Sequence, residues 1–455
     1  MKRTSRFLAI LLTLAVLFSV TALAVTTTSA WPVYGGNDKH NSVVTSAPTK
    51  SKPTVTRIGL QNSGSGWTGV DNVPVMQTVD GTTYAYVLYD GHSAGCMLTK
   101  VNCNAGTIVW EKQLESTSGF QLSTPLLVQG SDANSEADDT IYAASNGGTV
   151  YQISGLDATA ASGVTSTAIY TVSAGQINTP ITYNNGYIYF GTWIGNGTIE
   201  GSTAPGRYYQ LNVNDTSDVQ SVSSIARGFY WAGAVVYNGY VYFGGDDGYL
   251  YYRPAGAGFG TTTDDDIRET SMQFSTVSGD NVRSSVMLDD GMLYFTSQGG
   301  TLWCYSVNAS THRPVNEWSA DLGVKSTSTP TKVGDRIYVG IYPGFNNGGV
   351  LCVTAEVNDD EKYDINIANV VENVAGNGKP VQSSIVVMGD GSGTDYLYFN
   401  TNSGTGAGHC YSYDGTTAAS VWSTESKTYA LGGMAIDNGY AVFGNDYNFL
   451  YVVHD

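Results

Sequence analysis

The segment NTPITYNNGYIYF, residues 178–190, contains the pattern from which the fold can be predicted. A small-small-Pro entry comes first, then a turn that ends in Gly186, and then the run Tyr187-Ile188-Tyr189-Phe190. Aromatic and apolar runs bounded by Gly and Asn turns are typical of short β-strands, whose successive side chains point to opposite faces. The segment therefore predicts short strands separated by tight turns.

The same pattern recurs along the chain. Its entries begin at Asn72, Ser123, Asn178, Ala232, Ser284, Ser328, Ser383 and Gly432, so successive entries lie 44 to 55 residues apart. Each unit has room for about four strands and contains no amphipathic helical stretch, which is typical of a β-propeller. We interpret the chain as all-β with eight blades. Seven blades remain an alternative if one copy is an elaborated loop.

The two ends of the chain are predicted to meet in one blade. The last copy, at about residues 428–455, has room for three strands only, while the strand-like segment 54–60 precedes the first entry. Pairing the two would complete the last blade and remove the exposed edges that an open sheet leaves. The prediction is a ring closed by an N-terminal strand that completes the last blade.

Residues 1–30 have the three parts of a secretory signal peptide. A basic start is followed by an apolar run at residues 7–18 and by small residues before two plausible cleavage points, Ala24 and Ala30. Removal of the signal would leave a single propeller domain over residues 31–455. No Cys lies near either cleavage point and no later segment is long and apolar enough to span a membrane, so we expect a secreted or cell-surface protein that is not a lipoprotein.

The overall charge argues against one class of partner. Asp and Glu number 39 against 21 Lys and Arg, which gives a formal net charge of -18. Phosphate backbones repel so acidic a surface, and nucleic-acid binding is therefore not expected. The five Cys are an odd number, so at least one thiol has no intrachain partner. Three of them, Cys304, Cys352 and Cys410, recur at one position of the repeat, which predicts buried side chains.

Three copies of the repeat end in a longer phrase, over residues 102–110, 308–318 and 414–422. The phrase resembles the Asp-x-x-Thr-Gly-x-x-x-Trp docking motif of pyrroloquinoline quinone (PQQ)-like propellers, a family in which the Trp packs between blades. The segment Trp31–Asn37 is similar to the opening of that family. The resemblance implies an eight-bladed PQQ-like propeller and structural docking roles for Trp110, Trp318 and Trp422.

The resemblance leaves the activity open. Quinoprotein dehydrogenases of this family hold PQQ and Ca²⁺ on the propeller axis, beside two adjacent Cys that form a disulfide. Here Cys96 and Cys103 are separated by a strand that would span about 23 Å, beyond disulfide reach. The missing pair does not by itself exclude PQQ, but the chain is also shorter than these dehydrogenases typically are. PQQ is not expected, and a PQQ- and Ca²⁺-dependent oxidoreductase stays an alternative. The five His show no metal-ligand spacing, while carboxylates from different blades could still form a glycosidase-like pair.

Basic residues recur at one place in the repeat. The loops that enter blades 4 to 8 carry Arg227, Arg283, Lys325, Lys379 and Lys427. In an acidic protein, an arc of positive charge near the axial mouth would attract a carboxylate-bearing ligand or an acidic loop of a partner. The alternative is that each cation pairs with a neighbouring carboxylate or points into solvent.

Aromatic residues gather on the same side, formed by the entry loops and the turns between second and third strands, which we call the entry-loop face. Trp67, Tyr230 and Trp231 lie in entry loops, and Trp193 lies in a second-to-third-strand turn. Exposed Trp and Tyr side chains suit sugar rings or protein hot spots. The alternative is packing between blades.

Two acidic loops on the opposite face are candidate structural Ca²⁺ sites. Oxygen-bearing side chains alternate in each of them: Asp132, Asn134, Glu136 and Asp138 in blade 2, and Asp390, Ser392 and Asp395 in blade 7. Ca²⁺ takes six to eight oxygen ligands, and neither loop has the complete calcium-loop sequence. The alternative is a polar turn whose carboxylates accept hydrogen bonds from local N–H groups.

The leading hypothesis is a secreted, non-catalytic propeller that acts as a binding or assembly platform outside the membrane, with a protein or a glycan as partner. The PQQ-like family includes the lipoprotein subunit of the outer-membrane β-barrel assembly machinery, which works in this way. A quinoprotein-like oxidoreductase is the second hypothesis. A carbohydrate-binding or carbohydrate-active surface protein is the third.

Overall fold

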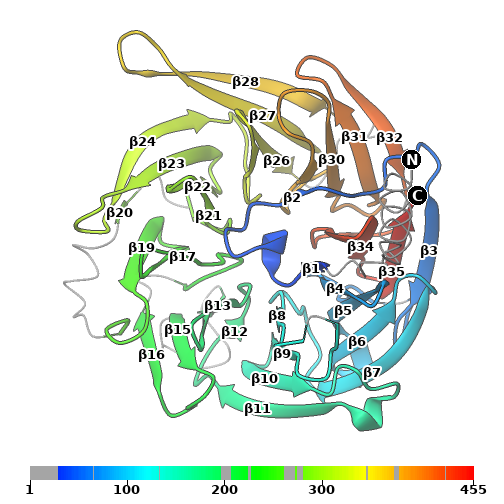
Figure 1. Cartoon of the computed structure of the whole chain (residues 1–455). Coiled ribbons are helices and arrows are strands. Elements are labelled where there is room, and N and C mark those ends of the chain that lie inside the picture. Colours follow the sequence, from blue (N-terminus) through cyan, green and yellow to red (C-terminus); the bar gives the residue numbers. More distant parts are fainter. Residues whose placement is uncertain are drawn as a thin grey trace, which may run out of the picture.

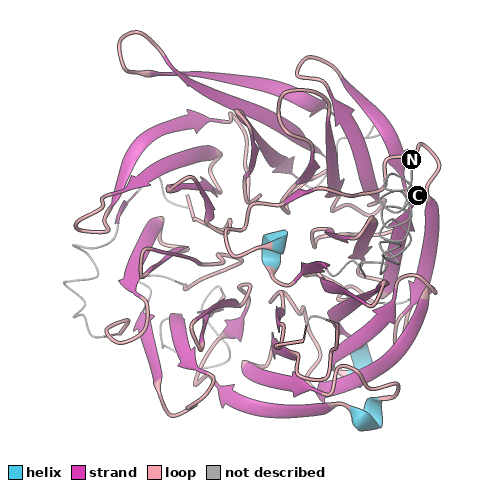
Figure 2. Cartoon of the chain, viewed as in Figure 1, coloured by secondary structure: helices cyan, strands magenta, loops and turns pink. Residues whose placement is uncertain are grey.

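The computed structural model describes residues 29–64, 66–132, 134–195, 206–223, 227–260, 272–273, 280–344, 347–372, 379–425 and 427–455. Within these residues the chain forms eight β-sheets around one central axis (Figure 1). Figure 2 shows strands throughout the ring, and the described residues contain three helices, all short 3-10 helices. The prediction of an all-β, eight-bladed propeller is confirmed. The predicted signal peptide lies outside the described residues, except for Ser29 and Ala30.

The first four blades follow one another along the chain. Blade 1 contains β4 (Val75–Val79), β5 (Thr82–Asp90), η2 (His92–Ala94), β6 (Cys96–Asn102) and β7 (Thr107–Glu115). Blade 2 contains β8 (Leu126–Val128), β9 (Thr140–Ala144), β10 (Thr149–Ser154), η3 (Ala161–Gly163) and β11 (Thr165–Thr171). Blade 3 contains β12 (Gln176–Ile177), β13 (Thr182–Asn184), β14 (Tyr187–Trp193), β15 (Arg207–Asn212) and β16 (Val219–Ser223). Blade 4 contains β17 (Val235–Tyr237), β18 (Tyr240–Gly244), β19 (Tyr249–Pro254) and β20 (Met272–Gln273).

The other four blades complete the ring. Blade 5 contains β21 (Met287–Asp289), β22 (Met292–Ser297), β23 (Thr301–Val307) and β24 (Pro314–Asp321). Blade 6 contains β25 (Thr331–Val333), β26 (Arg336–Gly344), β27 (Asn347–Val357) and β28 (Tyr363–Glu372). Blade 7 contains β29 (Val386–Met388), β30 (Asp395–Asn400), β31 (Gly408–Tyr413) and β32 (Ala418–Ser423). Blade 8 contains β33 (Ala435–Asp437), β34 (Tyr440–Gly444), β35 (Phe449–His454) and β3 (Thr54–Gly59).

Blade 8 joins the two ends of the chain. β3 pairs antiparallel with β35, so that Thr54 lies opposite His454 and Gly59 lies opposite Phe449 (Figure 1). The pairing gives β35 a partner along an edge that would otherwise be exposed. The ring is closed as predicted, by an N-terminal strand in the last blade.

Residues 31–44, which we call the axial segment, enter the centre of the ring. β1 (Ser29–Trp31) pairs with β4 of blade 1, and β2 (Val43–Val44) pairs in parallel with β29 of blade 7. Between them η1 (Tyr34–Gly36) lies at the centre of the ring (Figure 1, blue). Gly35 has a φ of +73°, and an added Cβ would lie 2.7 Å from the Cα of His40, so the tight turn needs glycine here.

The hydrophobic core lies between neighbouring blades. A Tyr of the second strand faces a Cys of the third in three blades, pairing Tyr294 with Cys304, Tyr338 with Cys352, and Tyr398 with Cys410. All five Cys are buried and unpaired, which matches the burial predicted for the three repeated ones. Burial raises the pKa of each thiol, which keeps these side chains protonated and inert.

The three Trp of the docking phrases are buried. Trp110 packs against Tyr86 of its own blade and belongs to a cluster that includes Leu127 of blade 2. Trp422 packs against Tyr398 and donates a hydrogen bond from Nε1 to the backbone oxygen of Pro48, 2.9 Å away. The outer strands are thereby attached to neighbouring parts of the chain. No helix in the described part of the chain is long and apolar enough to cross a membrane.

Candidate functional site

A pocket opens on the propeller axis at the entry-loop face. Its cavity volume is about 40 Å³, which is room for a few water molecules or one small polar group. Its lining comes from the axial segment and from the entry loops of all eight blades: Tyr34, Asp71, Asn72, Val73, Leu122, Thr124, Pro180, Trp231, Arg283, Ser285, Thr327, Thr329, Gln382, Ser383, Leu431, Gly432 and Gly433. The Tyr34 hydroxyl donates to Thr329 Oγ1 at 3.0 Å, which fixes the axial segment against the pocket wall.

One predicted basic residue, Arg283, lines this pocket as part of a polar network. Its Nε and Nη2 donate to the two oxygens of Asp246, at 2.8 and 2.7 Å, and its guanidinium lies 4.7 Å from the ring centre of Tyr230. Trp193 Nε1 donates to the same carboxylate at 2.8 Å. Two of the predicted residues, Arg283 and Trp193, therefore meet at Asp246, which the sequence interpretation did not single out, and Tyr230 packs on Arg283.

The other four predicted cations do not join Arg283 in one surface. Lys379 is buried and donates to the backbone oxygen of Thr405 at 2.6 Å, while Lys427 lies 3.4 Å from Glu425. Arg227 and Lys325 are exposed. The charge of Arg283 is balanced by Asp246, so the cations nearest the axis are used in internal contacts. A binding role for the basic arc remains a prediction for the exposed members.

The predicted aromatic residues divide into two groups. Trp193 packs edge-on against Tyr230, and Tyr230 packs at a tilt against Trp231, with ring centres 4.8 and 4.6 Å apart, and Trp231 lines the pocket. Trp67 is 71% exposed and lies 6.0 Å from the ring of Tyr429. Phe120 and Tyr447 are also exposed on this face, at 45% and 38%.

Two buried carboxylates at the pocket were not among the residues predicted from the sequence. Asp71 lines the pocket and Asp446 of the β34–β35 turn interacts with it. Burial raises the pKa of Asp71, and burial together with the charge of Asp71 raises the pKa of Asp446 further. Two carboxylates in contact cannot both ionise cheaply, so the pair retains a proton near neutral pH.

A sequence signal for these turns does exist. One position of the second strand lies opposite the first residue of the first strand in most blades, as Tyr86 lies opposite Val75. Seven blades have a Tyr at this position, and blade 8 has Val442. The residue four positions later is polar or aromatic in every blade: Asp90, Asn146, Trp193, Asp246, Gln298, Tyr342, Asn402 and Asp446. This repeat position could have indicated the residues around the axial mouth.

The two predicted Ca²⁺ loops hold their carboxylates in internal contacts. Glu136 is buried and accepts a 2.5 Å hydrogen bond from Lys100, while Asp138 accepts from Ser131 and Asp132 accepts from the backbone N–H of Asn134. No group of three or more His, Cys, Asp or Glu side chains in the described residues is placed to hold a metal ion.

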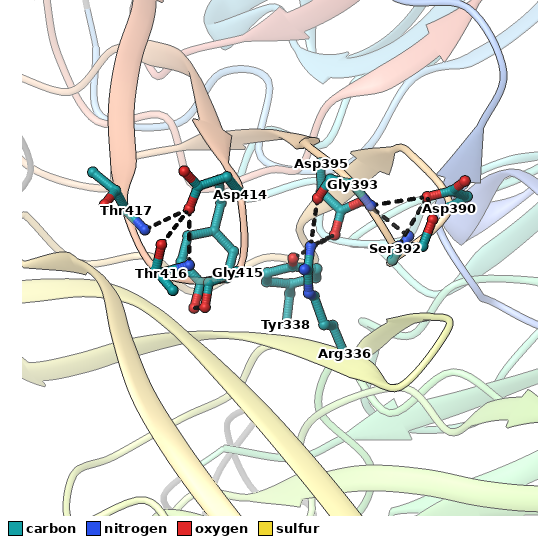
Figure 3. Close-up of polar contacts among 12 residues, drawn as sticks. Arg336, Tyr338, Asp390, Ser392, Gly393, Asp395, Asp414, Gly415, Thr416 and Thr417 are labelled. Atoms are coloured by element: carbon teal, nitrogen blue, oxygen red, sulfur yellow. Dashed lines mark hydrogen bonds and ion pairs between the residues drawn. The ribbon is translucent and has the colours of Figure 1, made fainter.

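The blade 7 loop shows the same behaviour (Figure 3). Asp390 accepts hydrogen bonds from the backbone N–H and hydroxyl of Ser392, whereas Asp395 accepts from Arg336 and Tyr338 at 2.9 and 2.7 Å. These contacts are those of a polar turn. Calcium binding by the two loops remains a prediction, and a melting temperature that falls on treatment with EDTA would support it.

The axial pocket does not fit PQQ. The cofactor carries three carboxylates. Arg283 is the one cation among the described lining residues, and its Nε and Nη2 already donate hydrogen bonds to Asp246. Asp71 and Asp446 would place further negative charge beside a bound tricarboxylate. The residues present therefore offer neither the anion-binding set nor, among those described, a cluster of metal ligands for its Ca²⁺.

No protein-family model matches the sequence, and no curated protein sequence matches it. Solved structures do match. BamB from Moraxella catarrhalis is 12% identical with a TM-score of 0.51, over 88% of this chain and 98% of BamB. Quinohemoprotein alcohol dehydrogenase from Comamonas testosteroni is 8% identical with a TM-score of 0.57, over 95% and 81%. A europium-containing methanol dehydrogenase is 12% identical with a TM-score of 0.54, over 91% and 89%.

These similarities concern the fold. The three structures named above are PQQ-like propellers, and this chain likewise forms eight blades around an axis, five of them four-stranded and three five-stranded. The protein therefore has the fold of an eight-bladed β-propeller, similar to that of these structures. Both BamB and the two dehydrogenases share that fold, so activity has to be argued from the site.

Proposed function

We propose that this protein is an exported binding platform that engages its partner through the entry-loop face and performs no catalysis. The observation that carries the proposal is the placement of exposed aromatic residues. Among the described residues, the large aromatic side chains most exposed to solvent are Trp67, Phe120 and Tyr447, and all three lie on the entry-loop face. Exposed aromatic side chains that gather on one face of a protein are typical of interaction surfaces.

The loops that carry these residues are held by hydrogen bonds. Asp90 accepts from the hydroxyls of Thr68 and Ser118, which ties the loop of Trp67 to the loop of Phe120. The N–H of Gly64 donates to the backbone oxygen of Tyr447 at 2.8 Å. A surface that is already ordered loses less conformational entropy on binding, which favours affinity.

The axial segment supports the same assignment. It hydrogen-bonds to blade 2 through Pro32, to blade 5 through Lys39 and to blade 7 through Ser42. Tyr34 of this segment and Trp231 line the axial pocket, and the exposed aromatic residues lie on the same face, in loops of blades 1, 2 and 8. A partner that docks on the entry-loop face would therefore cover both features together.

Site-specific photo-cross-linking tests the proposal. A benzophenone amino acid at Phe120 or Tyr447 should give a discrete cross-linked product in the extracellular fluid of the source cells. The matched control is Val315, which is 44% exposed on the outer strand of blade 5. Equal cross-linking from Val315, or none from the two face positions, would contradict the proposal. A glycan array distinguishes a carbohydrate partner from a protein one, and addition of PQQ with Ca²⁺ should give no tight chromophoric complex.

A further inference from the structure

The axial pocket is rich in unused hydrogen-bond acceptors. Asp71 Oδ1, Asn72 Oδ1 and Ser383 Oγ are buried atoms of lining residues without a hydrogen-bond partner among the described residues. Asp446 Oδ1 is also buried, and apart from the proton that Asp71 and Asp446 share it has no donor among the described residues. Buried acceptors without donors are costly, so their concentration at one pocket indicates a ligand that donates hydrogen bonds.

The orientation of Asn72 is fixed by its own contacts. Its side-chain nitrogen donates to the backbone oxygens of Leu88 and Gln121, at 2.9 and 2.7 Å. Because both of these partners are acceptors, the amide must point its nitrogen toward them and keep its oxygen free. Asn72 is only 3% exposed, so this oxygen is held in place rather than moving in solvent.

The net charge at the pocket is negative. The guanidinium of Arg283 is neutralised by Asp246, whereas Asp71 and Asp446 have no cation paired with them in the described residues. The remaining lining is apolar or aromatic at Val73, Leu122 and Trp231, which suits an aliphatic stem.

We propose that the axial pocket binds an organic cation, an ammonium or guanidinium group, whose N–H donors are accepted by Asp71 and Asn72 with Asp446 adjoining. The inference rests on the proposed function of the entry-loop face and names the ligand chemistry that this face accepts. A metal ion is a poorer fit, because Ca²⁺ requires six to eight oxygens and part of this pocket is apolar.

Binding of a cation should release the proton that the acid pair retains. Affinity therefore rises with pH between about 6 and 9, below the range in which an alkylamine itself loses its proton. The other ionisable groups near the pair are Asp90, His92, Tyr230, Arg283 and Asp246. Asp446→Asn removes the retained proton while leaving Asp71 and those groups in place, so its affinity should lose most of this pH dependence.

Isothermal titration calorimetry tests the proposal on the full mature protein. The probes are butylamine, N-acetyl-lysine amide, N-acetyl-arginine amide and the neutral isostere N-acetyl-norleucine amide. We expect at least one cation to bind ten or more times tighter than the isostere. The observed binding enthalpy should vary with the ionisation enthalpy of the buffer, which reports the proton release. Tightest binding by butylamine assigns the site to free amines, and tightest binding by a capped amino acid assigns it to a partner's side chain. Either result supports the proposal.

Variants decide whether the acid pair is responsible. Asp71→Asn should weaken cation binding at least tenfold, whereas Asp335→Asn, an exposed charge change on the opposite face, should not. Equal loss in the two variants, equal binding of the isostere, unchanged pH dependence in Asp446→Asn, or binding of CaCl₂ without any amine would overturn the proposal. If the wild-type protein binds none of the amines but cross-linking from Phe120 and Tyr447 is observed, this inference is wrong and the proposed function is still supported.

Discussion

Arg283 and Asp246 join blades 5 and 4 beside the axial mouth through two parallel hydrogen bonds of 2.8 and 2.7 Å. The carboxylate is fully buried and the guanidinium is 15% exposed. The ion pair also holds the aromatic cluster, because Trp193 shares the carboxylate and Tyr230 lies against the guanidinium. The pair therefore sets the shape of the pocket wall as well as its charge.

Removal of one partner of this ion pair should destabilise the protein. Arg283→Met leaves the buried Asp246 carboxylate without its cation, which costs about 3 kcal/mol of unfolding free energy. Adding Asp246→Asn removes the uncompensated charge and should recover about 1 kcal/mol or more. Urea denaturation of the two variants measures both values. A double variant no more stable than the single one would contradict this reading of the pair.

The closing strand offers a matched pair of substitutions. Ile58 of β3 is buried in the core shared by blades 7, 8 and 1, and Val55 of the same strand is 42% exposed. Ile58→Ala should lower the unfolding free energy by about 2–4 kcal/mol, and Val55→Ala by no more than about 0.5 kcal/mol. Denaturant unfolding checks both, and equal effects would show that β3 does not seal the ring.

His40 should make stability depend on pH. It is fully buried in the axial segment, and burial lowers its pKa to about 4, against about 6.5 in the unfolded chain. The unfolded chain then binds the extra proton, so the contribution is complete above pH 6.5 and is lost as the pH falls toward 4, by up to about 3 kcal/mol.

The matched test is His40→Asn against His454→Asn. Asn tolerates the positive φ of 56° at position 40, and His454 is partly exposed. The first variant should flatten the dependence of unfolding free energy on pH between 4 and 6.5, and the second should leave it unchanged. A slope that persists in His40→Asn would assign the effect to other groups.

The acid pair should act in the opposite direction. The pKa of Asp446 is raised in the folded state by burial and by Asp71, so the folded protein holds a proton that the unfolded chain has lost. Stability falls as the pH rises above the ordinary carboxyl range and through the raised pKa. Asp446→Asn should therefore be more stable than the wild type at pH 8 and gain less at pH 5. Thermal melting at the two pH values measures this, and an equal change at both would refute it.

The sequence predicts the ring well because blade formation is local. In Tyr187–Phe190 and its counterparts, the side chains that point to the two faces of a strand alternate within a few residues. The segment 54–60 supplies the fourth strand that the last blade lacks. The pocket depends instead on contacts between distant residues. Tyr34 reaches Thr329, and Asp71 meets Asp446, only after the ring has closed. No local pattern contains such pairings.

The prediction for the basic arc shows the same limit. Lys379 and Arg283 occupy the entry loops as expected, yet their partners, Thr405 and Asp246, come from second-to-third-strand turns. The spacing of cations along the sequence specifies their place in the repeat. It does not specify which carboxylate or carbonyl oxygen accepts their hydrogen bonds. The position of that acceptor determines whether the positive charge is available to a ligand.

Hydrogen–deuterium exchange tests the central claim, that the entry-loop face is the binding surface, most directly. Exchange is compared for the protein alone and in the extracellular fluid of the source cells. We expect at least twofold slower exchange in peptides covering residues 66–74, 116–125 and 427–434, and no change in the opposite-face turns at 80–81, 238–239 and 290–291. Protection confined to those opposite turns would contradict the claim.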